Sequence, residues 1–481
     1  MSKKTNIISI ITDDQGYWSL GSYGNKDAIT PTLDYLADNG IRFENFFCAS
    51  PVCSPARASI YTGRIPSQHG VLDWLDEWND GSTTEEYLKG QSTFVNVLAK
   101  NGYECAMSGK WHLGLADKPQ KGFKHWYSHQ KGGGPYYGAP MYKDGVLIYE
   151  KEYVTDTITD YGLAFLDSQK NSYKPFYLSL NYTAPHAPWD SKNHPKELLD
   201  LYKNCDFSYC PREKRHPWSI EFIYPESEEE RKELLKGYFA ALTSVDNNIK
   251  RVLKKLKDLN MLEDTLILYT SDNGMNMGHH GIYGKGNGTS PVNMYDTSVK
   301  VPCFITKFRE IKPKVCKNLL SHYDIRPTIL EYLGLEDNIE KNINLPGKSF
   351  ASLLKGNECD LENDVVIYDE YGPTRMIRTD KWKYIHRYSD GPFELYDLEN
   401  DPEEKINLIN DKDKEEIVLQ LRLKLKEWFI KYVNPEINGA ELPVFGGGQV
   451  GLAGLWGKEK AAFKRYDSDF IFTGDGLLKN D

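Results

Sequence analysis

The sequence predicts an α/β fold with a mixed, mostly parallel sheet flanked by helices, followed by a smaller C-terminal α+β domain that carries an antiparallel sheet. Two apolar runs, 7–11 and 266–269, are typical of strands that are buried on both faces of a parallel sheet. Helical apolar patterns lie between these runs. After about residue 362 the pattern changes to short strands and turns, which indicates the second domain.

The length of 481 residues also favours more than one domain, because single hydrophobic cores stop growing near about 250 to 300 residues. We predict a catalytic domain at 1–361, an antiparallel-sheet subdomain with one helix at 362–437, and a Gly-rich tail at 438–481. The tail includes the apolar stretch 445–457, which is expected either to fold back over the cleft or to contact a neighbouring subunit.

Several helices and strands have recognisable ends. Pro31 begins a helix that Gly40 is expected to end, and Gly102 ends a second helix at 92–101. Ser227 and Glu230 form a capping box for a long scaffold helix with one apolar stripe, over about 227–259. Further helices are expected at 324–333 and 414–433, and further strands at 41–43, 174–182, 365–368, 375–379, 382–385 and 394–397, with a strand that runs into a loop within 103–114.

Composition narrows the class of partners. The formal net charge is −10 and no basic run could follow a phosphate backbone, so nucleic acid is not an expected partner. The run 7–11 is too short for a signal peptide or a membrane span, which favours a cytoplasmic protein that is not bound to a membrane. Cys205 and Cys210 could form a bridge or bind metal. The cysteines are otherwise scattered, as in a reduced compartment, at positions 48, 53, 105, 205, 210, 303, 316 and 359.

Oxygen-bearing side chains follow both apolar runs. Asp13 and Asp14 come after the first, and Asp272 and Asn273 after the second. Adjacent carboxylates repel each other unless a cation lies between them, and carboxyl ends of parallel strands are where open α/β sheets bind ligands. The four residues therefore suit a hard divalent cation such as Ca²⁺ or Mg²⁺, and solvated loop acids are the ordinary explanation.

The stretch 50–64 is the most distinctive in the chain. Pro55 suits the first turn of a helix, so Cys53 would lie at the positive end of that helix, with Arg57 one turn along. A buried structural cysteine is the default interpretation, but it explains neither Arg57 nor the Thr-Gly-Arg that ends the stretch at Arg64.

Other candidate residues lie in loops after predicted strands. Lys110 and His112 would project to one side if their segment is extended, and two prolines hold His186 in a stiff loop. Residues 123–145 are rich in glycine and aromatic residues, which suits loops that line a cleft; loop packing is the alternative. His279, His280 and Lys285 follow Asn273 and add nitrogen groups near the predicted cation site.

These segments resemble the motifs of the sulfatase family and occur in the order of that family over most of the chain. Cys-x-Pro-x-Arg with a trailing Thr-Gly-Arg matches at 53–64, Gly-Lys-Trp-His-Leu-Gly at 109–114, Pro-His-x-Pro at 185–188, and Leu-Tyr-Asp-Leu-x-x-Asp-Pro at 395–402. The chain departs from the pattern at His279, where an acidic residue is usual, and at Lys300, where arginine is common. The resemblance implies an alkaline-phosphatase-like fold.

The resemblance also implies the roles of individual residues. A maturation enzyme, met transiently, would oxidise Cys53 to formylglycine. Asp13, Asp14, Asp272, Asn273 and residue 53 would ligate Ca²⁺. Lys110 would hold the sulfate and the oxygen of the nucleophile, and His112 would take up the proton of that oxygen. The remaining residues expected to contact the substrate are Arg57, His186, Lys285 and, with a less certain role, His280.

The function predicted from the sequence is the hydrolysis of sulfate monoesters, either aryl sulfates or sulfated carbohydrates, to an alcohol and inorganic sulfate. One alternative is a phosphomonoester or phosphodiester hydrolase of the same superfamily. A second alternative is an inactive protein that binds sulfated glycans. Neither the natural substrate nor the oligomeric state is indicated by the sequence.

Overall fold

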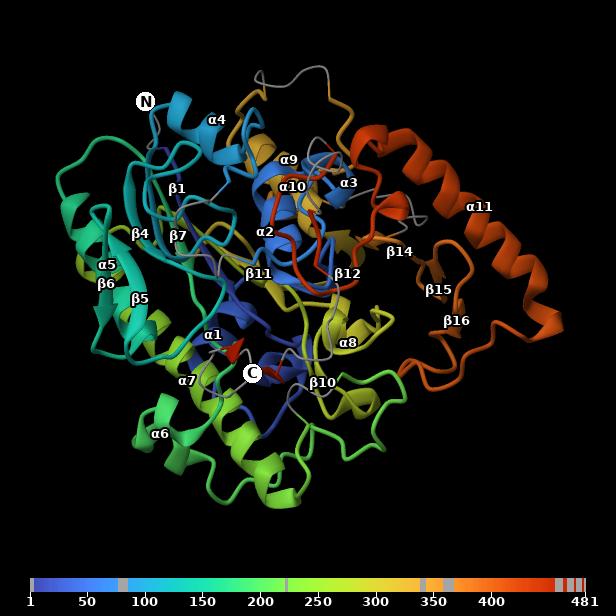
Figure 1. Cartoon of the computed structure of the whole chain (residues 1–481). Coiled ribbons are helices and arrows are strands. Elements are labelled where there is room, and N and C mark those ends of the chain that lie inside the picture. The colour runs from blue at the N-terminus through green and yellow to red at the C-terminus, as the bar shows by residue number, and fades with distance from the viewer. Residues whose placement is uncertain are drawn as a thin grey trace.

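A computed structural model of the chain describes residues 4–76, 85–220, 224–337, 343–357, 367–454, 462–464, 471–472 and 478–479. The largest feature within them is a ten-stranded sheet of order β12-β2-β11-β8-β1-β7-β3-β4-β5-β6 (Figure 1). Its strands are β1 (Asn6–Thr12), β2 (Ile41–Phe47), β3 (Glu104–Lys110), β4 (His125–His129), β5 (Ala139–Lys143), β6 (Val146–Glu150), β7 (Phe176–Asn181), β8 (Thr265–Ser271), β11 (Cys303–Thr306) and β12 (Lys314–Ser321).

The centre of the sheet is parallel and its outer parts contain the antiparallel pairings. β8, β1, β7, β3 and β4 all run in one direction. β11 runs antiparallel to both β8 and β2, and β5 and β6 form an antiparallel edge. The predicted mixed, mostly parallel sheet is therefore confirmed.

β1 shows why the sequences of the central strands are continuously apolar: both faces of the strand are buried. Ile7 and Ile11 belong to the core on one face of the sheet, and Ile8 and Ile10 to the core on the other. The first core also contains residues of α2 (Cys53–Thr62), α4 (Phe94–Lys100) and α9 (Ile325–Tyr332). The second contains residues of α1 (Pro31–Asp38), α5 (Val154–Ser168) and α7 (Glu228–Asp258).

Helix ends follow local sequence with one exception. The Ser227 hydroxyl accepts a hydrogen bond from the Glu230 amide at 3.1 Å and begins α7, as predicted. Gly102 follows α4 with a φ of 87°, which suits a glycine after a helix. Gly40 likewise follows the C-cap residue of its helix, Asn39, but its φ is not positive, so it does not end α1 as a left-handed glycine. A Cβ on Gly40 would lie 2.3 Å from the Ile305 carbonyl oxygen, so close packing explains this glycine.

The C-terminal part contains the predicted antiparallel sheet and helix, seen at the right of Figure 1. The sheet consists of β13 (Ile367–Tyr371), β14 (Thr374–Arg378), β15 (Trp382–Arg387) and β16 (Glu394–Asp397), and α11 (Glu415–Tyr432) packs on it. The domain boundary at 361/362 lies outside the described residues and stays a prediction. Short elements are α3 (Pro66–His69), α6 (Lys196–Leu201), α8 (Asp296–Val299), α10 (Ala351–Leu354), β9 (Asn276–Met277), β10 (Tyr283–Gly284), β17 (Ile471–Phe472) and β18 (Leu478–Lys479).

The prediction that 123–145 forms loops was wrong for two parts of the segment, 125–129 and 139–143. β4 and β5 lie in it, and Phe123, Trp126 and Tyr136 are at most 7% exposed. Trp126 packs edge-on against Trp111 and donates its indole N–H to the Ala116 carbonyl at 2.7 Å. These rings fill the core and are unavailable as stacking surfaces for a substrate.

Three further expectations can be compared with the described residues. Cys205 and Cys210 are both free thiols, and Cys359 lies outside the described part. Residues 446–451 of the tail lie against the segment 70–76, whereas the two predicted alternatives, a cover over the cleft or a subunit contact, stay predictions. No helix in the described ranges has the length and apolar character needed to cross a membrane.

Candidate active site

The predicted site residues meet at the carboxyl edge of the parallel strands. Asp13 and Asp14 follow β1, Asp272 and Asn273 follow β8, and Lys110 is the last residue of β3. Because β8, β1, β7 and β3 are neighbours, residues far apart in sequence become adjacent. Cys53, at the start of α2, joins them, and all six side chains are at most 4% exposed.

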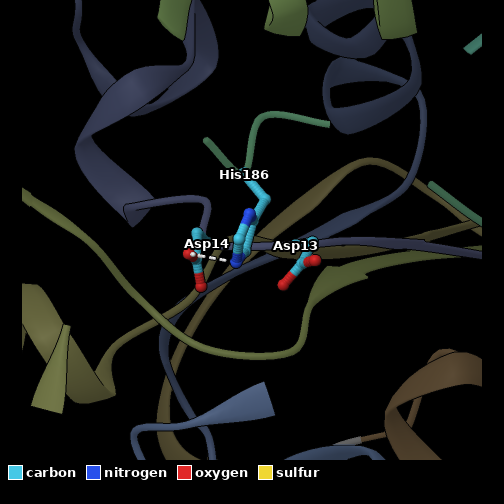
Figure 2. A group of neighbouring side chains, drawn as sticks. All are labelled: Asp13, Asp14 and His186. Carbon is cyan, nitrogen blue, oxygen red and sulfur yellow. Dashed lines mark ion pairs between the residues drawn. The ribbon is translucent and has the colours of Figure 1, made fainter. Parts of the chain in front are cut away.

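Two overlapping groups of these residues have the geometry of a cation site. One atom each of Asp13, Asp14 and His186 lies within 4.8 Å of the others, and Figure 2 shows the three side chains converging. The same holds for Asp13, Cys53 and Asp272. Asp13 belongs to both groups and is therefore central.

The donor atoms fit a hard divalent cation. Asp13 Oδ1 and Asn273 Oδ1 are buried without a hydrogen-bond partner in the described structure. Burial, followed by the charge of Asp272, raises the pKa of Asp13 well above its usual range. Unpaired buried oxygens and crowded carboxylates are costly, and a calcium or magnesium ion would relieve both effects. The residues thus fit the predicted cation.

Each of the three carboxylates is paired with a cationic side chain. Lys110 Nζ lies 2.5 Å from Asp13 Oδ2, Lys285 Nζ lies 2.5 Å from Asp14 Oδ1, and Arg57 Nε lies 2.8 Å from Asp272 Oδ2. Although burial opposes ionisation of Asp14, Lys285 and His186 hold its pKa well below the usual range. The site therefore holds a compact set of positive charges within an acidic protein, which suits an anionic substrate.

α2 brings the cysteine and the arginine into this set. The helix begins at Cys53, as predicted, and Arg57 follows on its next turn. Lys285 Nζ lies 3.0 Å from Cys53 Sγ. Arg57 also donates from Nη1 to the Lys110 carbonyl at 3.0 Å, whereas its Nη2 has no partner within the described residues. A cation with a spare donor beside the cysteine is suited to hold an oxyanion.

His112 occupies a defined orientation. Its φ of 54° shows that the segment after β3 is not extended, so the assumption behind its predicted direction was wrong. Nε2 lies 2.8 Å from the Leu75 carbonyl oxygen, which can only accept, so Nε2 carries the proton. Nδ1 is then a lone-pair acceptor, and it is buried with no partner among the residues described. Burial lowers the pKa of His112 well below 6.5.

His186 lies beside Asp13 and Asp14. Its Nδ1 donates to the Ala187 carbonyl at 2.7 Å, and its Nε2 lies 3.6 Å from Asp14 Oδ2. Burial lowers the pKa of His186 to about 4. The imidazole therefore presents an unprotonated Nε2 to the acids, and it can donate to a substrate oxygen only after Nε2 takes up a proton. The predicted substrate contact of His186 stays a prediction.

His279 and His280 pack elsewhere. The ring of His280 stacks on Tyr295 with a centroid distance of 3.7 Å, and the ring of His279 lies 4.7 Å from that of Trp18. No hydrogen bond or ion pair among the described residues joins His280 to the acids. Its predicted part in substrate binding stays a prediction.

Sequence reasoning missed the role of three consecutive glycines. A Cβ on Gly132 would lie 2.1 Å from the ring of His112, and a Cβ on Gly133 would lie 2.8 Å from that of His186. A Cβ on Gly134 would lie 3.4 Å from the ring of His129. The glycine run was visible in the sequence, but nothing local showed that it faces histidines from other segments.

Asn181 and His322 were also missed. Asn181 ends β7 and donates to the Lys110 carbonyl at 3.0 Å. His322 donates to the Ser271 carbonyl, just before Asp272, at 3.0 Å. A polar residue that ends a buried strand is the same signal that identified Asp13, so Asn181 could have been found from sequence.

Comparisons with known proteins agree with this geometry. The family model described as "Sulfatase" matches residues 5–335, and the model described as "N-sulphoglucosamine sulphohydrolase, C-terminal" matches 278–431. An N-acetylglucosamine-6-O-sulfatase of Bacteroides thetaiotaomicron is 29% identical and aligns over 93% of this chain and 90% of its own length.

Two solved structures share the fold. One is a complex with its substrate D-glucosamine-2-N,6-O-disulfate; it has 26% identity and a TM-score of 0.74, and the match covers 89% of this chain and 98% of the other. The second is a phosphonate monoester hydrolase of Agrobacterium radiobacter, with 22% identity and a TM-score of 0.71, covering 88% and 95%. The second likeness concerns the fold alone.

The family match covers well over half of the chain, and the structure gathers its cysteine, carboxylates and cations at one edge of the sheet. The chain belongs to the sulfatase family and is a sulfuric ester hydrolase.

Proposed function

We propose that the protein hydrolyses sulfate monoesters with a formylglycine made from Cys53 and a bound Ca²⁺ ion. The observation that carries the proposal is the position of Cys53, at the start of α2, 3.0 Å from Lys285 Nζ and grouped with Asp13 and Asp272. In the reaction the bond from sulfur to the alcohol oxygen breaks. Water supplies the oxygen that sulfur retains, and the alcohol oxygen gains a proton.

The cation is assigned to the carboxylate oxygens of Asp13, Asp14 and Asp272, the amide oxygen of Asn273, and residue 53. When bound, Ca²⁺ supplies Lewis acidity toward a sulfate oxygen. Formylglycine supplies, as its hydrate, one hydroxyl that attacks sulfur and a second through which the sulfate is later released. A cysteine or serine lacks the second hydroxyl, which gives a physical reason for the modification.

The other residues of the chain bind the anion and move protons. Lys110, Lys285 and Arg57 offer donors to the sulfate oxygens, and the unpaired Nη2 of Arg57 needs no broken contact to do so. His112 Nδ1, with Nε2–H held by the Leu75 carbonyl, accepts a proton from residue 53. His186 steadies the bridging oxygen or protonates the leaving alcohol through Nε2 in its doubly protonated form, which the neighbouring charge of Asp14 favours.

The proposed substrates are sulfated carbohydrates, with aryl sulfates as a further class. Support comes from the N-acetylglucosamine-6-O-sulfatase that aligns over 93% of this chain and from the structure bound to D-glucosamine-2-N,6-O-disulfate. Phe123, Trp126 and Tyr136 are buried and offer no stacking surface that would favour an aryl group.

The test combines two measurements on one preparation. Peptide mass spectrometry gives the fraction of Cys53 that has been converted to the aldehyde. Hydrolysis is then measured on glucosamine 6-sulfate, an aryl sulfate and the matched aryl phosphate, with and without Ca²⁺. Cys53→Ala is the control for the nucleophile.

The proposal expects sulfate release to rise with the converted fraction, to need Ca²⁺ and to vanish in Cys53→Ala. A fully converted sample that cleaves the aryl phosphate faster than the sulfates would indicate a phosphorus hydrolase. A fully converted sample that binds sulfated sugars without turnover would indicate a binding protein. Either result would overturn the proposal.

A further inference from the structure

The C-terminal tail is built into the polar structure around His112. Residues 446–451, here called the tail segment, lie against residues 70–76. The segment 70–76 is itself more than 30 residues before Lys110, the next residue of the active site. In Figure 1 the red end of the chain crosses the region of the blue helices α2 and α3. Nothing in the function proposed above uses this contact.

Gln449 is the centre of the contact. It is fully buried, its Oε1 accepts from the Leu72 amide at 2.9 Å, and its Nε2 donates to the Gly70 and Gly451 carbonyls at 2.9 Å. Its backbone N–H donates to the Trp74 carbonyl at 2.7 Å, and its carbonyl accepts from the Asp76 amide at 2.9 Å. The side chain of Gln449 therefore holds the beginning of the segment 70–76, and its backbone holds Trp74 and Asp76, the neighbours of Leu75.

Leu75 lies between these fixed points and touches the site directly. Its carbonyl oxygen accepts from His112 Nε2 at 2.8 Å. Its amide donates to the hydroxyl of Ser54 at 3.1 Å, and Ser54 is the neighbour of Cys53. Leu75 and Gln449 also form a parallel β-bridge. The position of the Leu75 carbonyl decides which nitrogen of His112 carries the proton and where the other nitrogen points.

A second set of contacts holds the tail segment in place. The buried carboxylate of Asp73 accepts from the Gly448 amide at 3.0 Å and from the hydroxyl of Tyr371 in β13 at 2.5 Å. The Gly446 carbonyl accepts from the Trp74 indole at 3.0 Å and from the Asn287 amide at 3.4 Å. Asn287 is two residues from Lys285, so the tail segment joins two walls of the site.

We propose that Gln449 is a positioning residue of the active site: it fixes residues 70–76 so that the Leu75 carbonyl holds His112 with Nδ1 directed to the reacting group. The inference rests on the role of His112 in the proposed function. Gln449 touches no reacting atom and acts through Leu75.

The test replaces Gln449 by methionine, which has a similar volume but none of the side-chain hydrogen bonds. Because a positioned base contributes about 10²- to 10⁴-fold, we expect kcat to fall by about 10-fold or more while KM changes by less than about twofold. The same substitution is made in a His112→Ala protein. If Gln449 acts only through His112, Gln449→Met should not lower the kcat of the His112→Ala protein any further.

Gln169→Met is the matched control, because Gln169 is a buried glutamine just after α5 and contacts Ser168, away from the site. Its kcat should equal that of the wild type. Hydrogen exchange measured by mass spectrometry gives a readout that does not need activity. Peptides covering 70–76 and 111–114 should exchange faster in Gln449→Met than in the wild type or in Gln169→Met.

Three results would overturn the inference. The first is an unchanged kcat in Gln449→Met. The second is a decrease in kcat that is as large in the His112→Ala protein as in the wild type, and the third is unchanged hydrogen exchange at 70–76 and 111–114. If the wild type released no sulfate from any ester, the proposed function would fail. The exchange measurement would then still decide whether Gln449 fixes the segment that holds His112.

Discussion

Gly132→Ala would disable His112 without altering His112 itself. The added Cβ would lie 2.1 Å from Cε1 of the ring, 2.4 Å from Nε2 and 2.7 Å from Nδ1, and all three distances are far below contact. Gly132 is not among the glycines with a positive φ, so its backbone accepts alanine. The ring must therefore leave its place, and with it the hydrogen bond to the Leu75 carbonyl.

Two magnitudes follow from this displacement. Losing one hydrogen bond of this kind lowers the free energy of unfolding by about 1 kcal/mol. Losing a positioned base lowers kcat by about 100-fold or more. We thus expect a folded protein whose kcat approaches that of His112→Ala.

The assay is sulfate release at saturating substrate, together with thermal unfolding. Gly134→Ala is the matched control, because its Cβ would meet the nearest ring, that of His129, at an ordinary 3.4 Å. Gly134→Ala should keep the kcat of the wild type. We expect a decrease in kcat of about 100-fold. If kcat of Gly132→Ala stayed within about threefold of the control, the backbone around residue 132 would have moved instead of the His112 ring, and the reasoning would be wrong.

Three further predictions concern stability. Arg57→Met leaves the buried carboxylate of Asp272 without its partner at 2.8 Å. Denaturant unfolding without calcium should therefore show a free energy of unfolding lower by about 3–5 kcal/mol, and a decrease below about 1 kcal/mol would contradict this. Ca²⁺ should raise the melting temperature of the wild type but not of Asp13→Asn, and equal shifts would exclude Asp13 as a ligand. Burial raises the pKa of Asp73 to about 6 in the native state, whereas the unfolded chain releases this proton near 3.8. The free energy of unfolding of the wild type, relative to Asp73→Asn, should therefore fall by about 2 kcal/mol as pH rises from 4 to 7, and a constant or rising difference would refute this.

Much of the fold could be predicted because its signals are local. Ile7 to Ile11 read as a strand covered on both faces, and the structure places alternate residues in the cores on the two faces. Helix ends such as Ser227 and Gly102 depend on neighbours within a few residues. The segment 123–145 was predicted only in part, because its glycine and aromatic residues occur both in loops and in the strands β4 and β5.

The sequence by itself determined the chemistry of the site: the carboxylates that end two strands, the cysteine that begins a helix, and the lysines and histidines of the motifs. Only the tertiary structure decided how these groups are paired and oriented. Lys110 and Asp13 are 97 residues apart, and Gln449 lies 374 residues beyond Leu75, with which it forms a β-bridge. Residue type is written in the local sequence, whereas the proton on His112 Nε2 depends on a carbonyl that packing brings from another segment, because a hydrogen bond requires a partner within about 3 Å.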